Sequence, residues 1–223
     1  MVLESSILKV KTQPRDAATL ILVRFDGPAP RILMGQRHTG HTFMPNKFVF
    51  PGGGFDAADS KQPVAVKGER VTIEKLKLRM RPKPSSRRAH GLLVTALRET
   101  YEETGFQAGG SPFDLTGLVY FARAITPPGR SRRFDSRFFV ADASIVTNLE
   151  SPHPLPSEEL LELNWVTMPE ALQLNLPSIT RDVLGLLAPF LAEKCLPPKD
   201  CPISFHFNRG KTWRVEMLSP HKT

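Results

Sequence analysis

Three closely spaced glutamates are the residues in this sequence with the clearest capacity for chemistry. Glu99, Glu102 and Glu103 lie in the segment 98–106, and the largely apolar run before it predicts a helix. Residues three and four positions apart are neighbours on a helix, so the three carboxylates can converge. Carboxylates held together repel one another unless a cation neutralises them. The segment therefore predicts a site for a divalent metal ion.

A solvated acidic helix face is the competing interpretation, because that is the commoner meaning of a run of charges. Two features favour the metal site. Gly105 predicts that the helix ends in a left-handed residue directly after the glutamates. Acidic side chains in the last turn of a helix are disfavoured by the helix dipole. A sequence that tolerates this penalty indicates that the carboxylates have a use.

A glycine-rich segment upstream is the second candidate for chemistry. A short apolar strand at 48–50 leads through Pro51 into three glycines at 52–54, and Asp59 follows shortly after. Glycines allow a backbone to bend sharply, to approach a ligand closely, or to present an uncovered carbonyl to a metal. The segment therefore suits contact with a metal or a phosphate.

Together the two segments resemble the signature of the Nudix hydrolases. That signature is a glycine, five residues, a glutamate, seven residues, and then Arg-Glu-apolar-any-Glu-Glu-any-Gly-apolar. Gly53 matches the first glycine, and Asp59 stands where the first glutamate belongs. The second half is matched in place by Arg98, Glu99, Glu102, Glu103, Gly105 and Phe106, while Thr100 occupies a position that is usually apolar. The larger departure is the spacing, because 38 residues (60 to 97) separate Asp59 from Arg98 where the pattern has seven.

The interrupted spacing resembles a subgroup of that family, the Nudix enzymes related to the coenzyme A diphosphatases of peroxisomes. Three short segments carry this resemblance: Phe43-Met44-Pro45, Asp56-Ala57-Ala58-Asp59 and Arg133-Phe134-Asp135. The resemblance covers roughly residues 15 to 190. It implies a metal-dependent hydrolase that cleaves a diphosphate bond in a nucleoside-diphosphate-linked compound, with coenzyme A or an acyl derivative as the candidate substrate.

The resemblance also implies roles for individual residues. Glu102 and Glu103 bind the metal, assisted by the main-chain carbonyl of Gly52. Glu99 is either a further ligand or the carboxylate that orients and deprotonates the attacking water. Mg²⁺ or Mn²⁺ suits oxygen ligands and phosphate. Arg98 braces the glutamates through a charge-assisted bond and serves the chemistry from there.

Arginines late in the chain are candidates for binding the substrate phosphates, because the guanidinium fork matches phosphate oxygens. Arg132 and Arg133 are assigned this role, together with the backbone at Gly53. Arg133 and Asp135 could equally form a structural ion pair, and the sequence does not decide between the two.

Three acidic residues are candidates for a further ligand or base, as in some related enzymes: Glu158, Glu159 and Glu162. For any single one, a solvated helix start after Pro156-Ser157 is the better interpretation.

The enzyme hypothesis competes with a Nudix fold that has lost catalysis and senses a ligand or a nucleic acid. The intact glutamates favour the enzyme, whereas Asp59 and the long interruption leave the sensor open as an alternative. Nucleic acid as a partner rests on charge alone, because the sequence contains no evident helix-turn-helix, zinc finger or aromatic RNA-binding signature.

The composition indicates one globular core and no membrane partner. The chain has 223 residues, of which 40% are hydrophobic, and that length suits one well-buried core better than two. No apolar run reaches the length of a membrane span, and residues 1–11 contain no secretory apolar region. Cys195 and Cys201 do not make a disulfide framework. A reducing cytoplasm is therefore expected.

The net charge of +8 predicts an anionic partner, which a small-molecule diphosphate substrate would satisfy. Much of the charge lies in residues 60–88, within the segment that separates the two halves of the signature. This basic insertion can be interpreted equally as a solvated loop or as a phosphate-attracting lid.

The predicted elements indicate an α/β fold, a Nudix-type α/β/α sandwich with a mixed β-sheet. Strands are expected over 17–25, 31–37, 115–125 and 134–141, and helices over 71–80 and 178–193. Residues 1–195 are assigned to the Nudix hydrolase domain, with the insertion at 60–88, and 196–223 to a C-terminal extension. Alternating apolar residues around Asn208-Arg209-Gly210 predict a β-hairpin there. Its apolar face must pack as a lid, as a homodimer contact or as an added edge of the sheet.

Overall fold

The computed structural model describes residues 13–38, 40, 45–150 and 159–220. Four α-helices lie in this part of the chain: α1 (Arg70–Lys77), α2 (Ser86–Thr104), α3 (Met168–Gln173) and α4 (Ser178–Ala192). Two short 3₁₀ turns accompany them, η1 (Asp59–Lys61) and η2 (Ala143–Ile145). The strands are β1 (Arg15–Arg24), β2 (Arg31–Arg37), β3 (Phe48–Val49), β4 (Gly52–Gly54), β5 (Val64–Val66), β6 (Phe113–Asp114), β7 (Val119–Ile125), β8 (Phe134–Asp142), β9 (Leu160–Thr167), β10 (Ile203–Arg209) and β11 (Thr212–Leu218).

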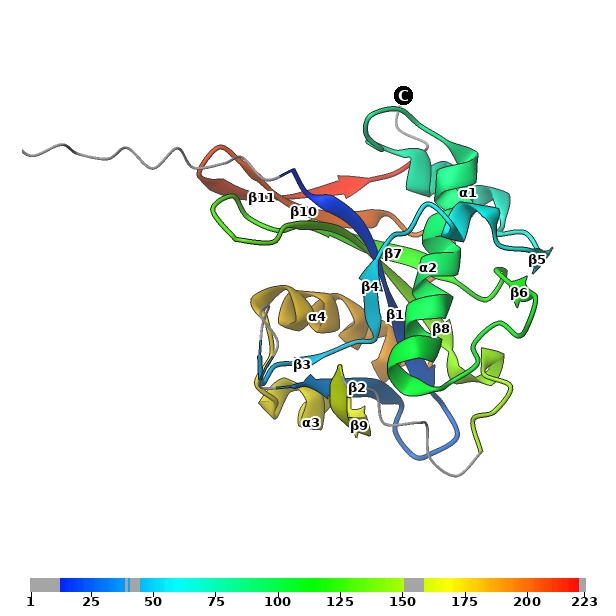
Figure 1. Cartoon of the computed structure of the whole chain (residues 1–223). Helices are drawn as coiled ribbons and strands as arrows, with labels where there is room; N and C mark the ends of the chain where they lie inside the picture. Colours follow the sequence, from blue (N-terminus) through cyan, green and yellow to red (C-terminus); the bar gives the residue numbers. More distant parts are fainter. Residues whose placement is uncertain (1–12, 39, 41–44, 151–158, 221–223) are drawn as a thin grey trace, which may run out of the picture.

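A mixed sheet of nine strands forms the centre of the molecule (Figure 1). Its main path runs β11-β10-β7-β8-β1-β2-β3, and β4 pairs with β1 while β9 pairs with β2. The β1–β8 and β10–β7 pairs are parallel, whereas β1–β2, β1–β4 and β7–β8 are antiparallel. β5 and β6 make a separate two-stranded sheet.

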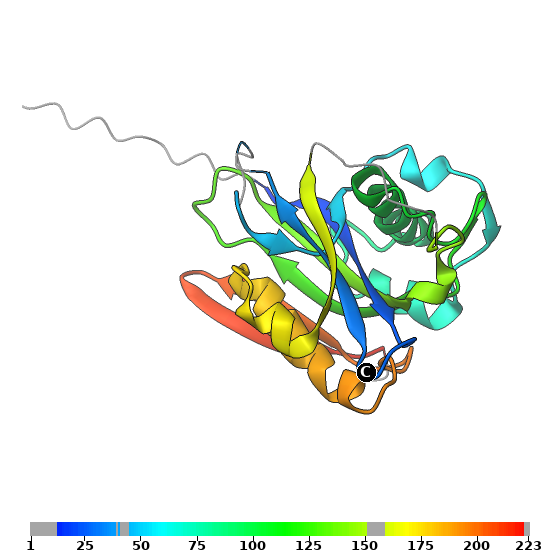
Figure 2. The ribbon, with the colours of Figure 1, turned by 90° about the horizontal axis from the view of Figure 1, so that it is seen from below.

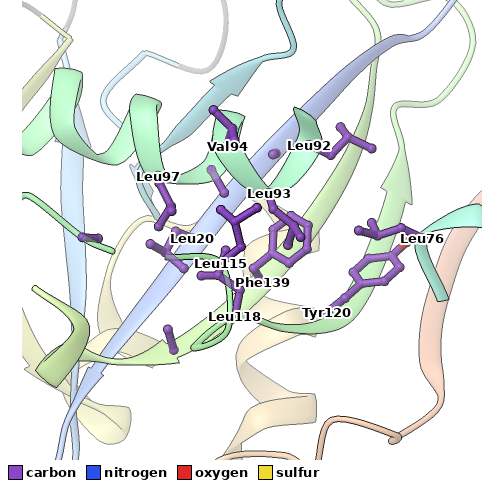
Figure 3. Close-up of a cluster of buried hydrophobic side chains, with 14 of the residues drawn as sticks. Leu20, Leu76, Leu92, Leu93, Val94, Leu97, Leu115, Leu118, Tyr120 and Phe139 are labelled. Atoms are coloured by element: carbon purple, nitrogen blue, oxygen red, sulfur yellow. The ribbon is translucent and has the colours of Figure 1, made fainter. Parts of the chain in front are cut away.

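Helices cover both faces of this sheet, as the expected α/β/α sandwich requires. One apolar core joins α1 and α2 to the sheet through residues such as Leu20, Leu93 and Phe139 (Figure 3). The other core joins α3 and α4 to the opposite face, where Val183 and Leu187 pack. Figure 2 shows α4 on one side of the sheet and α2 on the other. The predicted fold class is confirmed.

Helix α2 begins at a serine cap and ends at Gly105, as the sequence predicts for its end. The side chain of Ser85 accepts a hydrogen bond from the Arg88 backbone N–H, which satisfies one of the free amides of the first turn. Gly105 ends the helix in the left-handed conformation, with φ of 72°. Between these ends, the apolar side of the helix packs into the core, and the glutamates occupy its last turns.

The basic insertion packs as part of the core. Ile73, Leu76 and Met80 are buried among residues of α2 and the sheet, which confirms the helical spacing predicted over 71–80. The Nζ atom of Lys75 is buried and donates to the carbonyls of Tyr120 (2.6 Å) and Lys199 (2.9 Å). The interpretation of the whole insertion as a solvated loop is therefore wrong. Lys75 also cannot attract phosphate, since its donors are used inside the protein.

The predicted C-terminal hairpin is present, and it extends the main sheet. β10 pairs in parallel with β7, and β11 pairs with β10 and forms the outer edge (Figure 1). The turn is at Gly210-Lys211, one position later than expected. Of the three expected roles, the structure shows the added edge of the sheet, and Trp213, Val215 and Met217 stay exposed in the single chain.

The segment before Trp165 is another correction. Residues 160–167 form strand β9, paired with β2, where the acidic residues had indicated the start of a helix. Pairing with β2 overrides the local charge pattern. Among the described residues, no helix is long and apolar enough to cross a membrane.

Candidate active site

The two segments that could do chemistry lie together although 38 residues separate Asp59 from Arg98 in the sequence. Asp59 begins η1 and is only 2% exposed. Its carboxylate accepts hydrogen bonds from Arg98 Nε (2.8 Å) and Nη2 (3.1 Å). It also accepts from Thr95 Oγ1 (2.7 Å) and from the Asp56 backbone N–H (3.0 Å). This two-pronged ion pair fixes the glycine-rich segment against α2.

The electrostatics of this pair favour its charged form. Burial alone would raise the pKa of Asp59, but the hydrogen bonds from Arg98, Thr95 and the Asp56 backbone outweigh it and hold that pKa below its ordinary value. The pKa of Arg98 is raised, chiefly by its hydrogen bonds to Asp59. Both side chains are therefore ionised across the physiological pH range.

Arg98 connects Asp59 to the glutamates. Its Nη1 atom lies 2.8 Å from Oε2 of Glu102 and 3.0 Å from Oε1 of Glu99. Its Nη2 atom also donates to the carbonyl of Gly54 at 3.1 Å. The guanidinium thus touches the glycine-rich segment and two of the three glutamates, which is the position expected of a brace.

Glu103 is the most deeply buried of the three glutamates, with 3% of its surface exposed. Its Oε2 atom accepts a hydrogen bond of 2.8 Å from the Gly52 backbone N–H. Burial raises the pKa of Glu103 well above its ordinary value, the Gly52 bond opposes this, and nearby Glu159 and Glu99 raise the pKa further. A carboxylate in this position is costly to ionise unless a positive charge approaches it.

Glu99 lies directly against the glycine-rich strand. A Cβ atom at Gly53 would overlap the Glu99 carboxylate, so only glycine permits this approach. Burial raises the pKa of Glu99, Arg98 lowers it, and Glu102 and Glu159 raise it again. Strand β4 therefore meets two glutamates, Glu103 through the Gly52 N–H and Glu99 through the bare Gly53 backbone.

Arg37 and Glu159 join this cluster from elsewhere in the chain. Arg37 ends β2 and is close enough to Glu103 to lower its pKa, while Glu159, just before β9, raises the pKa of Glu99 and Glu103. The Nε atom of Arg37 is buried and has no hydrogen-bond partner among the described residues. Glu162 lies in β9 opposite Gln36 and is exposed, and Glu158 lies outside the described residues.

The carboxylate oxygens of the site suit a hard divalent cation, although they do not converge on a single point. In the described part of the chain, no three acidic, histidine or cysteine side chains are arranged to hold a metal ion. Arg98 holds Glu99 and Glu102, and Glu103 turns toward the Gly52 N–H. The chemistry of the site nevertheless suits Mg²⁺ or Mn²⁺. Three glutamate carboxylates lie together, at least one of them is deeply buried, and the nearby arginines do not balance all of their negative charge.

Comparisons with solved structures identify the fold. A Nudix hydrolase from Alicyclobacillus acidocaldarius superposes with a TM-score of 0.60 at 25% sequence identity, covering 84% of this chain and 99% of that one. The NUDIX domain of Shewanella oneidensis NrtR, solved in complex with ADP ribose, gives a TM-score of 0.51 at 12% identity, covering 83% of this chain and 93% of that domain. The chain has the Nudix fold.

A sequence relative supports the Nudix hydrolase family. A Caenorhabditis elegans protein, provisionally named nudix hydrolase 7, is 27% identical over 162 residues, which are 71% of this chain and 53% of that protein. The chain therefore spans about half the length of this curated relative. No family model matches the chain.

The arginines expected to bind substrate lie on the β7–β8 connection. Arg132 is exposed, and Arg133 donates through Nε to the Thr126 carbonyl at 3.0 Å. Asp135, the residue expected as a structural partner for Arg133, accepts hydrogen bonds from Arg123 at 2.7 and 2.6 Å. Of the segment 43–45, only Pro45 lies among the described residues, so the two preceding positions are not placed.

Proposed function

We propose that this protein is a divalent-metal-dependent hydrolase that cleaves a diphosphate bond in a nucleoside-diphosphate-linked compound. The observation that carries the proposal is the contact between Asp59 and Arg98, with Arg98 in turn on Glu99 and Glu102. It places the glycine-rich half of the interrupted signature directly beside the glutamate half. The Nudix fold of the chain and its Nudix relatives point to the same chemistry.

Glu99, Glu102 and Glu103, with the main-chain carbonyl of Gly52, are the residues that would hold Mg²⁺ or Mn²⁺. The bound ion would neutralise charge on the diphosphate oxygens and lower the pKa of the attacking water. The raised pKa of Glu103 supports this assignment, because burial makes its charged form costly until a cation approaches.

The remaining work falls to the protein side chains. Arg98 keeps Glu99 and Glu102 in place, since Asp59 fixes its guanidinium from behind. Glu99 and Glu159 are the two candidates for orienting the water. The two side chains are close enough for Glu159 to raise the pKa of Glu99. Arg37 adds a cation beside Glu103 and can bind a phosphate oxygen with its Nε, which has no hydrogen-bond partner among the described residues.

Coenzyme A or an acyl-coenzyme A is the proposed substrate within this class. The segment Asp56-Ala57-Ala58-Asp59 supports this substrate through the resemblance to the coenzyme A diphosphatases. The net charge of +8 also supports it, because coenzyme A carries a 3′-phosphate in addition to its diphosphate. The insertion supports it less than its composition indicates. Lys75 is buried, Arg79 pairs with Glu216, and Arg88 pairs with Asp16. ADP-ribose, which the Shewanella oneidensis NUDIX domain binds, is the comparison compound.

The test is a screen of diphosphate-linked metabolites with Mg²⁺ and with Mn²⁺, in which released phosphoesters are measured. Coenzyme A should yield 3′,5′-ADP and a phosphopantetheine. Glu102→Gln and Glu103→Gln should each lower turnover by roughly a hundredfold or more, the scale expected when a charge-stabilising group is lost. Both variants should keep the wild-type circular dichroism spectrum.

Two results would change the proposal in different ways. Equal rates for coenzyme A and dephospho-coenzyme A at every ionic strength would overturn the substrate, since attraction of the 3′-phosphate must weaken as salt screens it. An absence of turnover with every compound, combined with tight ligand binding, would favour a Nudix-fold sensor instead.

A further inference from the structure

Strand β11 carries a row of exposed apolar side chains on one of its faces. Trp213, Val215 and Met217 are 41%, 52% and 59% exposed, and they alternate along the strand, so they share one face. They are three of the six large hydrophobic residues that are exposed in the described part of the chain. Such a concentration marks a surface that another molecule covers.

β11 is a long and regular edge strand, the kind of edge that can pair with another chain. It is seven residues long, contains no proline, and pairs with β10 in an unbroken register. The strand at the other end of the main sheet path, β3, has only two residues. Among the described strands, β9 also has a single partner, β2, but its pairing shifts register between Gln36 and Arg37. β11 is therefore the long edge strand with unbroken pairing, at which this sheet can be extended.

The face of β11 opposite the apolar row is fixed to the rest of the protein. Glu216 forms an ion pair of 2.6 Å with Arg79. The Arg79 guanidinium lies 5.9 and 6.0 Å from the ring centroids of Phe205 and Phe207, which stack on each other at 4.6 Å. Because these contacts already order the strand, pairing with a partner would cost little additional entropy.

The apolar row lies on the side of the sheet that α4 covers. Val215 is paired across the hairpin with His206, whose Nδ1 lies 4.0 Å from Oδ2 of Asp182 on α4. The ring of Trp213 lies 6.0 Å from the His206 ring. Helix α4 thus reaches β10, where His206 is buried, and leaves the row on β11 uncovered.

We infer that a second copy of this chain pairs with β11, antiparallel and about a two-fold axis at Val215. In this register Val215 meets its own copy, and Trp213 faces Met217 of the partner subunit. Arg214 faces Glu216 of the partner subunit, so opposite charges match twice across the axis. The two apolar rows then lie side by side on one face of a continuous sheet.

The hydrogen-bonding pattern of the backbone is compatible with this register. Gly210 and Lys211 make a two-residue turn, so Arg209 and Thr212 are the first pair that exchanges hydrogen bonds across the hairpin. Bonded and non-bonded pairs alternate from there, which leaves the N–H and C=O groups of positions 213, 215 and 217 pointing away from β10. An antiparallel pair centred on Val215 uses all of these free groups.

The experiment measures the oligomeric state of the full chain by sedimentation equilibrium. We expect the wild type to have twice the 24.9 kDa chain mass. Val215→Lys, which places two cations on the axis, should make it monomeric. Arg214→Glu sets like charges opposite each other twice and should weaken the dimer by at least about tenfold. Val66→Lys, at a residue 45% exposed on β5, is the matched control and should leave the mass unchanged.

A charge-exchange experiment tests the register itself. Glu216→Arg should also weaken self-association, whereas an equimolar mixture of Arg214→Glu and Glu216→Arg chains restores two opposite-charge pairs and should form a heterodimer. Each variant is checked by its circular dichroism spectrum and melting temperature. A monomeric wild type overturns the inference. A dimer that survives Val215→Lys places the contact on another surface and overturns it as well.

Discussion

Removing the carboxylate of Asp59, which joins η1 to α2, should destabilise the protein strongly. The side chain accepts two hydrogen bonds from Arg98, one from Thr95 and one from the Asp56 backbone. Breaking a buried ion pair costs about 3–5 kcal/mol when the remaining charge is left without a partner. Arg98 keeps Glu99 and Glu102 and is partly exposed, so the lower end applies. We expect Asp59→Ala to lower the free energy of unfolding by about 3 kcal/mol.

Urea denaturation followed by circular dichroism measures this loss, with Asp56→Ala as the matched control. Asp56 is exposed. Within the described part of the chain, its side chain accepts one local hydrogen bond, from the Ala58 backbone N–H to Oδ1. Its loss should cost under about 1 kcal/mol. Equal losses for the two variants would show that the pair between Asp59 and Arg98 does not hold the segments together.

The pH dependence of the unfolding free energy tests the same ion pair independently. The folded-state pKa of Asp59 lies below its ordinary value of 3.8, so its contribution to stability is present above pH 3.8 and is lost as pH falls through the folded-state pKa. The difference in unfolding free energy between wild type and Asp59→Asn should therefore be constant near neutral pH and shrink below pH 3.8. A difference that grows on acidification would refute the reasoning.

Three smaller predictions follow from single contacts. Gly53→Ala should lower turnover by at least about tenfold, because the new Cβ displaces the Glu99 carboxylate, whereas Gly54→Ala has open space and should leave the rate unchanged. Burial lowers the pKa of His206, so the stability of the wild type should fall as pH drops below 6.5. In His206→Gln, the melting temperature should depend less on pH between pH 7.5 and 5. Ser85→Ala removes the cap of α2 and should cost about 1 kcal/mol in urea denaturation, and no loss would mean that the cap is unimportant.

The elements that the sequence predicts well are those with local signals. Gly105 marks the end of α2 because left-handed termination depends only on adjacent residues. The hairpin of β10 and β11 is predicted for the same reason, from alternation around a glycine turn. The spacing of Ile73, Leu76 and Met80 likewise predicts α1.

The features that the sequence did not predict depend on distant contacts. Arg37 reads as the last residue of a strand, and only the fold brings it beside Glu103. Glu159 is one of three acidic candidates, and only the pairing of β9 with β2 distinguishes it by bringing it near Glu99. Lys75 counts as surface charge in the composition, yet two backbone carbonyls bind it in the interior. Local residue type cannot report such partners.

The exposed face of β11 shows a different limit of sequence-based prediction. The alternation of Trp213, Val215 and Met217 predicts a strand with one buried face, and the single chain leaves that face open. Pattern alone indicates that an apolar surface is covered, without identifying the molecule that covers it.

Binding of Mn²⁺, followed by the electron paramagnetic resonance signal of the free ion, tests the central claim most directly. The carboxylates at the end of α2 should bind the ion saturably in the wild type. Glu102→Gln should weaken binding by at least about tenfold, since even the loss of residues that support metal ligands has effects of that size. Glu74→Gln, on the exposed side of α1, is the control and should bind as the wild type does. Equal Mn²⁺ affinity for the wild type and Glu102→Gln would contradict a metal site at these glutamates.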